Sequence, residues 1–239
     1  MEDHRSMEDS LLTRQLDEYR IVSLLGHGGM ARVYRGVDTR LGRYVAIKVI
    51  DTPYRQDSTY VDRFQREARV IAPLNHPNVV ELYRYGEQEG FLYIVMQYIE
   101  GVDLGGILQG YKQDGEFMKP EEVLSIFREI CQALDYIHSK GGIHRDIKPS
   151  NVMLDKDAHA ILTDFGLSLL TEVGTRGEVF GSPQYIAPEQ AISSANVTPQ
   201  TDLYAVGVML YEVFTGQLPF EAADPLDLAL KHISESPPL

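Results

Sequence analysis

Between residues 97 and 101 the residue pattern of this chain changes from short, strand-like segments to longer, helical ones. Before this point apolar residues alternate with polar ones or come in short runs, which is typical of β-strands. Beyond it, apolar residues recur at helical spacing. The pattern predicts an α+β chain with two lobes: a small β-rich lobe over residues 19–96, a hinge over residues 97–101 and a larger helical lobe over residues 102–239.

Individual elements can be placed from the same periodicities. In the small lobe we expect a helix over residues 58–72 and strands over residues 21–25, 31–37, 44–50, 79–85 and 91–96. In the helical lobe we expect short strands over residues 152–154 and 160–163 and helices over residues 120–140, 201–215 and 225–233. Residues 1–18 are polar and acidic with little pattern, so a flexible lead-in is expected there.

Composition narrows the class of protein. The 239 residues are 44% hydrophobic and 24% charged, which is ordinary for a globular protein. The formal net charge of −13 argues against a nucleic-acid partner, which would require a basic face. No apolar run is long enough for a membrane span or a signal peptide, so no membrane segment and a cytoplasmic location are expected. The single cysteine, Cys131, excludes an internal disulfide and is predicted to be buried in its helix.

The segment from His144 to Asn151 carries the clearest chemistry of the chain. Asp146 can accept a hydrogen bond from an attacking hydroxyl, and Lys148 can neutralise a phosphate. Asn151 can offer its amide oxygen to a magnesium ion. Together these groups suit phosphoryl transfer, in which a protein mainly positions the reactants and offsets charge.

A glycine-rich segment joins the first two expected strands. It comprises Leu25, Gly26, His27, Gly28, Gly29, Met30, Ala31, Arg32 and Val33. Glycines allow the backbone to approach phosphates closely, but they also suit a plain hairpin turn. A strand on both sides is wrong for a dinucleotide-binding fold, in which a helix follows the glycines.

Two more charged residues stand beside apolar strands. Lys48 lies inside the strand Val45-Ala46-Ile47-Lys48, where a buried ammonium requires a partner unless the strand lies at an edge and the side chain reaches solvent. Glu67, in the following helix, is the candidate partner. Asp164 ends a short apolar strand and precedes Phe165-Gly166, which is also typical of a simple turn.

Taken together and in this order, these segments resemble the motifs of the protein kinases. The segment from Gly181 to Glu189, which ends in Ala-Pro-Glu, resembles the peptide-docking loop of the same family. The segments Gly-Gly-Met-Ala-Arg-Val, Ala-Pro-Glu-Gln and Asp-Leu-Tyr-Ala-Val-Gly resemble those of bacterial serine/threonine kinases. Lys148 is typical of serine/threonine kinases, because tyrosine kinases usually carry a different pattern there. Ala31 replaces the third glycine of the family pattern, and Ser150 replaces a glutamate that often accompanies a preference for basic substrates.

The resemblance implies ATP as the cofactor, Mg²⁺ (or Mn²⁺) as the metal, and a protein carrying serine or threonine as the substrate. Asp146 would orient the acceptor hydroxyl, Lys148 would steady the γ-phosphate, and Lys48, held by Glu67, would position the α- and β-phosphates. Asn151 and Asp164 would hold the metal. Residues implied to contact the nucleoside are Val33, Ala46, Met153, the hinge residues Gln97, Tyr98 and Ile99, and Asp103 at the ribose, with Met96 at the back of the pocket.

The resemblance also implies control by phosphorylation. Arg145 would pair with a phosphate on the activation segment, where the candidates are Ser168, Thr171, Thr175 and Ser182. Thr171 and Thr175 are preferred, because Ser182 resembles part of the docking loop. For Asp202 two readings stand side by side: a helix cap and an anchor for the backbone of the loop at His144–Asn151.

Two alternatives to an active protein kinase stay open. The chain stops before the arginine that usually pairs with the glutamate of Ala-Pro-Glu, so Glu189 is expected to lack that partner and apolar surface is expected to be exposed. A shortened, pseudokinase-like scaffold that binds nucleotide without turnover is therefore the second interpretation. A small-molecule phosphotransferase of related fold is the third, and Arg145 and Lys148 disfavour it.

Overall fold

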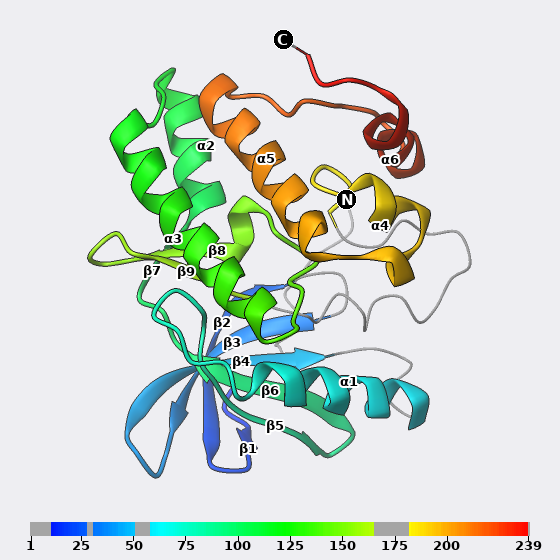
Figure 1. The fold of residues 1–239 in the computed structure, drawn as a ribbon. Coiled ribbons are helices and arrows are strands. Elements are labelled where there is room, and N and C mark those ends of the chain that lie inside the picture. The colour runs from blue at the N-terminus through cyan, green and yellow to red at the C-terminus, as the bar shows by residue number, and fades with distance from the viewer. Residues whose placement is uncertain (1–10, 28–30, 51–57, 165–181, 239) are drawn as a thin grey trace, which may run out of the picture. The chain divides into compact units, whose positions relative to one another are not determined.

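A computed structural model provides the three-dimensional description of the chain (Figure 1). The residues that it describes are 11–27, 31–50, 58–164 and 182–238. The chain divides into two compact units. The first contains Met1–Ala68 and Glu81–Ile99, and the second contains Arg69–Val80 and Glu100–Leu239. Residues 69–80, which we expected in the small lobe, thus belong to the second unit.

The first unit is built on a six-stranded antiparallel sheet with the order β1-β2-β3-β4-β6-β5. Its strands are β1 (Gln15–Leu16), β2 (Tyr19–His27), β3 (Ala31–Asp38), β4 (Arg43–Ile50), β5 (Leu82–Gln88) and β6 (Phe91–Gln97). Helix α1 (Ser58–Ile71) accompanies the sheet, and the ring of its Phe64 meets Tyr85 of β5 edge to face. The expected strand over residues 79–85 was placed too early, because β5 begins at Leu82.

One face of this sheet holds the core of the unit. Tyr34, Ile47 and Val95 stand opposite one another on β3, β4 and β6, and all three are completely buried. Side chains alternate between the two faces of a strand, so the residues between them project from the other face. Lys48, which follows Ile47 in β4, therefore projects from the face opposite the core.

The core of the first unit also includes part of the expected lead-in, which is a correction. Leu11 and Leu16 are buried in the same cluster as Tyr34, and β1 pairs with the start of β2. Arg14 forms an ion pair of 3.1 Å with Glu89, at the far end of the sheet. Residues 11–18 are thus folded onto the sheet, and residues 1–10 lie outside the described part.

The second unit combines helices with a small antiparallel sheet of order β7-β8-β9. Its elements are β7 (Gly101–Asp103), α2 (Leu104–Asp114), α3 (Pro120–Ser139), β8 (Val152–Asp155), β9 (Ala160–Leu162), α4 (Pro188–Ile192), α5 (Pro199–Thr215) and α6 (Pro225–Ser234), with short 3₁₀ turns at Pro149–Asn151 and Ser194–Asn196. The helices and strands that we predicted here are present, whereas β7 and α2 were not placed by the sequence. Gly101 pairs with Asp155, and a Cβ at Gly101 would stand 1.9 Å from the carbonyl oxygen of Leu154, so the close pairing of β7 requires glycine.

Helix α3 is the amphipathic helix expected over residues 120–140. Its buried positions follow helical spacing, and they include Ile126, Ile130 and Ile137. Cys131 stands one position beyond Ile130, which turns it away from this stripe, and it is exposed. The prediction of a buried cysteine was therefore wrong. Burial of part of the side chain and the nearby charge of Asp135 raise the pKa of its thiol.

Helix α5 settles the two readings of Asp202. The N-cap of α5 is Thr198, which forms a capping box with Thr201, so Asp202 lies inside the helix and is not its cap. Asp202 is nonetheless almost completely buried. Its carboxylate accepts hydrogen bonds from the backbone of the loop that contains Asp146.

Apolar side chains are exposed on α5 and α6, as the sequence led us to expect. They include Leu203 and Phe214 on α5 and Leu226 and Leu230 on α6. Glu189, by contrast, has a hydrogen-bond partner, because the hydroxyl of Thr201 donates to it at 2.6 Å. Across the described residues, every helix is too short or too polar to cross a membrane.

Candidate active site

In the first unit, strand register gathers the residues predicted to contact the nucleotide. Val33 stands directly opposite Gly26 on one side and Lys48 on the other. Directly opposed residues in an antiparallel pair project from the same face. Ala46, two residues from Lys48, shares this face, and so does its cross-strand partner Met96. The face opposite the core thus carries Val33, Ala46, Lys48 and Met96.

Lys48 lies in an inner strand of the sheet. Strand β4 is paired on both sides, with β3 and β6, and the side chain of Lys48 is half-buried. The alternative of an edge-strand lysine is therefore excluded. Glu67 falls within α1, but its side chain is outside the described part of the chain, so the predicted pair with Lys48 stays a prediction.

The glycine-rich segment joins β2 and β3 as expected. Leu25, Gly26 and His27 end β2, and Ala31 and Arg32 begin β3. Gly28, Gly29 and Met30 lie outside the described residues. The flanking strands are the arrangement that excludes a dinucleotide-binding fold.

The hinge follows β6. The backbone N–H of Gln97 already donates to the carbonyl of Glu81 at 2.9 Å. Tyr98 is half-buried and Ile99 is buried, and both stand at the end of the first unit.

In the second unit, the side chains of the loop at His144–Asn151 converge on one carboxylate. The ammonium of Lys148 lies 2.8 Å from Oδ2 of Asp146. The amide Nδ2 of Asn151 donates to the same oxygen at 3.0 Å and to the backbone carbonyl of Asp146 at 2.7 Å. Lys148 also donates to the hydroxyl of Ser182 at 2.8 Å. The three residues that the sequence singled out are thus brought together, and Ser182 joins them from the docking segment.

A buried carboxylate on α5 holds this loop in place. Asp202 accepts hydrogen bonds from the backbone N–H of His144 at 2.9 Å and of Arg145 at 2.8 Å. His138 of α3 lies 2.7 Å from the same carboxylate. Arg145 has a φ of 70°, which is unfavourable for a side-chain-bearing residue and costs about 1–3 kcal/mol unless neighbours impose it. Asp202 thus anchors the backbone of the loop, as the anchoring interpretation predicted, and its bonds hold Arg145 in this conformation.

Two further contacts fix the loop from other directions. The ring nitrogen Nε2 of His144 lies 3.0 Å from the carbonyl of Thr163, and Nδ1 accepts from the N–H of Asp146 at 3.4 Å. Because the imidazole is fully buried, the pKa of His144 is lowered, so it is held neutral. From α4, the amide of Gln190 donates to the carbonyl of Arg145 at 2.9 Å.

The residues predicted to hold a metal ion are compatible with magnesium. The Nδ2 group of Asn151 is fixed by Asp146, so its oxygen is the atom left to act as a ligand. Asp164 is half-buried and follows Thr163, whose N–H donates to the carbonyl of Asn151 at 2.9 Å. An amide oxygen and a carboxylate are hard ligands, which Mg²⁺ prefers. Asp164 itself has a φ of 58°.

The two remaining nucleotide residues are also neighbours. Asp103 of β7 stands directly opposite Met153 of β8. The carboxylate of Asp103 accepts from the N–H of Gly106 at 3.0 Å and so caps helix α2. The cap accounts for an acid at this position without excluding a contact with a ribose.

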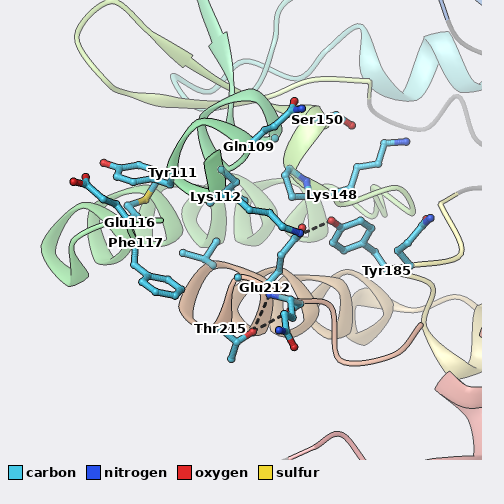
Figure 2. Close-up of a pocket in the computed structure, with 18 of the residues that line it drawn as sticks. Gln109, Tyr111, Lys112, Glu116, Phe117, Lys148, Ser150, Tyr185, Glu212 and Thr215 are labelled. Atoms are coloured by element: carbon cyan, nitrogen blue, oxygen red, sulfur yellow. Dashed lines mark hydrogen bonds between the residues drawn. The ribbon is translucent and has the colours of Figure 1, made fainter. Parts of the chain in front are cut away.

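The docking segment contacts α5. The hydroxyl of Tyr185 donates to Oε2 of Glu212 at 2.6 Å (Figure 2). Burial and this carboxylate raise the pKa of Tyr185 far above its usual range. The other candidate phosphorylation sites, Ser168, Thr171 and Thr175, lie outside the described residues.

Sequence reasoning missed several of these residues. Gln190 and His138 have no local signature, because their partners are distant in the sequence. The bond between Tyr185 and Glu212 likewise joins residues 27 positions apart. Only an argument from the fold could have found them.

The strand-rich unit with its glycine segment and the helical unit with its Asp-Lys-Asn loop define the two-unit architecture of a protein kinase. Comparison with known proteins agrees. The protein kinase domain family matches residues 19–237. The chain therefore belongs to this family.

Its curated relatives are serine/threonine-protein kinases of bacteria. The chain is 43% identical to the probable kinase PknB of Lactococcus lactis, covering 93% of this chain, and 38% identical to PrkC of Bacillus subtilis, covering 92%. It spans only 35% and 34% of the lengths of these two proteins. The crystal structure of the Mycobacterium tuberculosis PknI kinase domain superposes with a TM-score of 0.72 at 31% identity, covering 89% of this chain and 80% of that one.

Proposed function

We propose that this chain binds ATP with a divalent metal and transfers the γ-phosphoryl group to a serine or threonine hydroxyl of a protein. The observation that carries the proposal is the carboxylate of Asp146, which is held by Lys148 and Asn151 in a loop anchored by Asp202. Both side-chain contacts fall on Oδ2, so Oδ1 is able to accept a hydrogen bond from an incoming hydroxyl. Asp146 would then orient that hydroxyl and take its proton.

Lys148 serves two purposes in this proposal. Its contact with Asp146, at 2.8 Å from Oδ2, holds the carboxylate in its orientation. Its charge also offsets the negative charge that spreads over the γ-phosphoryl oxygens during transfer. Ser182 holds the ammonium from the docking segment, so a bound substrate segment and Lys148 would be positioned by the same group.

Each unit contributes its own set of residues that are expected to contact the nucleotide. Lys48 would bind the α- and β-phosphates, with Glu67 as its partner, and Val33 and Ala46 would contact the adenine. Because the N–H of Gln97 is engaged by Glu81, the amides of Tyr98 and Ile99 would be the donors to the base among the three residues implied at the hinge. Asp103 and Met153 would contact the ribose and the base.

Asn151 and Asp164 would hold Mg²⁺, which neutralises phosphate charge when it is bound. Two protein oxygens are an incomplete shell, and Mg²⁺ usually completes it with phosphate oxygens and water. The fixed Nδ2 of Asn151 keeps its oxygen available for this role.

Autophosphorylation of the activation segment is part of the proposal. Arg145 precedes the carboxylate of Asp146, and a phosphate on Thr171 or Thr175 would give its guanidinium an ionic partner. Incubation with ATP and magnesium, followed by mass-spectrometric site mapping, should find phosphate on one of these threonines. Modification found only elsewhere would remove this part of the proposal.

The central test is Asp146→Asn, assayed with labelled ATP, magnesium and a generic protein substrate. Loss of the proton acceptor should lower transfer by roughly 10²- to 10⁴-fold while nucleotide binding, followed by a fluorescent analogue, is retained. Asp157→Asn, at an exposed acid in the β8–β9 turn, is the matched control and should leave transfer unchanged. Nucleotide binding without transfer by the unaltered chain would instead support the scaffold interpretation.

A further inference from the structure

A pocket of about 590 Å³ opens beside Lys148 in the second unit (Figure 2). Its walls come from α2, the turn at residues 115–118, residues 148–150, the docking segment and the end of α5. The volume lies in the range of sites that bind organic groups. We refer to it as the α2–α5 pocket.

The lining of the α2–α5 pocket is mainly apolar. Leu108, Phe117, Met118 and Val213 contribute aliphatic and aromatic surface. Phe117 is 60% exposed although it is a large aromatic residue. Its ring lies against Gly216, where an added Cβ would stand 3.3 Å from the ring edge. The ring of Phe117 therefore packs against Gly216 on one side and is exposed to solvent at the rim of the pocket.

Several polar groups that line the pocket are already engaged in internal hydrogen bonds. Glu212 accepts from Tyr185 at 2.6 Å, and the hydroxyl of Tyr111 donates to Glu122 at 3.3 Å. The ammonium of Lys148 is bonded to Asp146 and Ser182. A polar ligand would compete with these internal bonds, whereas an apolar ligand would leave them intact.

The formal charge of the lining points the same way. Lys112 and Lys148 are balanced by Glu116 and Glu212. The pocket therefore offers a charged ligand no net attraction, and one of its two carboxylates, that of Glu212, already accepts a hydrogen bond from a phenol.

The position of the pocket identifies what would occupy it. Lys148 and Ser182 line it, and both are bonded within the group that holds Asp146. A polypeptide that brings a hydroxyl to Asp146 would therefore lie beside these residues. The occupant is thus a side chain of the same polypeptide, close in sequence to the acceptor.

From these observations we infer that the α2–α5 pocket binds a large apolar side chain of the protein substrate that flanks the phosphorylated serine or threonine. This inference rests on the proposed function. It gives Phe117 a specificity-determining role. It also implies that Glu212 positions Tyr185 and does not bind a basic residue of the substrate.

The test uses synthetic serine peptides in which each flanking position in turn is phenylalanine, alanine or arginine. At one position phenylalanine should raise kcat/KM by about tenfold over alanine, as burial of a large apolar side chain would. Phe117→Ala should remove most of this preference. Phe214→Ala is the matched control, because Phe214 is a 52% exposed phenylalanine on α5 outside the pocket, and it should keep the preference.

Three results would overturn the inference: no gain from phenylalanine at any position, equal effects of the two phenylalanine variants, or a preference for arginine that Glu212→Gln abolishes. If no peptide is phosphorylated, the proposed function fails, and binding decides the inference separately. Fluorescence anisotropy of labelled peptides should then show tighter binding of the phenylalanine peptide, and weaker binding to Phe117→Ala. Equal binding of the phenylalanine and alanine peptides would count against the pocket itself.

Discussion

Oδ1 of Asp202 accepts a hydrogen bond of 2.8 Å from the backbone N–H of Arg145, whose φ is 70°. The carboxylate is 1% exposed, so this bond and its neighbour from His144 are shielded from water. A side chain on a helix thus imposes an unfavourable backbone conformation on the residue before Asp146. The relationship shows how packing in the helical unit sets the geometry of the loop.

Replacing Asp202 with alanine should therefore destabilise the second unit. Two buried N–H groups would lose their acceptor, and His138 would lose its partner, at a cost of about 3 kcal/mol or more. Chemical denaturation measures the free energy of unfolding. Asp135→Ala, at an exposed acid of α3, should change it by less than about 0.5 kcal/mol. Equal stabilities of the two variants would contradict the anchoring role.

Ser182 should contribute to turnover through its hydroxyl. Ser182→Ala removes the acceptor that holds Lys148 from the docking segment, so kcat should fall roughly tenfold while the free energy of unfolding changes by about 1 kcal/mol. Ser182→Thr keeps a hydroxyl and should retain most of the turnover. Steady-state kinetics compares the variants with the unaltered chain. If the alanine and threonine variants lose kcat equally, the hydroxyl is not what matters.

Acid should destabilise the chain through its buried histidines. Burial lowers the pKa of His232, which lies 2.7 Å from the hydroxyl of Tyr204, and also that of His144. The unfolded chain then binds more protons than the folded one below about pH 6.5, so the free energy of unfolding falls as pH decreases from there, by at most about 1.4 kcal/mol per pH unit for each histidine.

Denaturation at pH 7 and pH 5 tests this expectation with two variants. His232→Phe removes one of the groups, so the loss of stability in acid should become smaller. The pKa of the exposed His159 is raised by its hydrogen bond to Glu129, so its effect has the opposite sign, and His159→Gln should not reduce the acid loss. If His232→Phe loses as much stability between pH 7 and pH 5 as the unaltered chain does, burial of this imidazole does not contribute to the destabilisation by acid.

The N-terminal segment should add stability to the first unit. Leu16 is 1% exposed within the core cluster, so Leu16→Ala should lower the free energy of unfolding by about 2–5 kcal/mol. Leu12, which is 37% exposed, is the control, and Leu12→Ala should cost less than about 1 kcal/mol. Urea denaturation measures both. Similar small losses would mean that this segment packs only weakly.

The sequence predicted the strands around Lys48 and the loop around Asp146, because both depend on local patterns. The alternation in β3 and β4 fixes which residues share a face, and the short spacing from Asp146 to Asn151 keeps their side chains within one loop. The same reasoning failed for Leu11 and Leu16, since the three leucines of this polar segment form no recognisable period.

Other features depend on partners that are distant in the sequence. An aspartate near the start of a helix fits a cap equally well, and only the position of His144 distinguishes an anchor from a cap at Asp202. Cys131 was misplaced by a single helical step of about 100°. Glu189 was expected to lack an arginine partner, and the sequence did not indicate that the hydroxyl of Thr201 on α5 donates to it.

Helix α5 sets the distance between two contacts of the second unit. Asp202 anchors the loop near one end and Glu212 holds Tyr185 near the other, ten positions and about 15 Å further along the axis. Inserting one residue between them would turn one end by about 100° relative to the other and advance it by about 1.5 Å. Either the anchor or the docking contact would then be lost. The number of residues between Asp202 and Glu212 is thus constrained. Substitutions keep this number, whereas insertions and deletions change it.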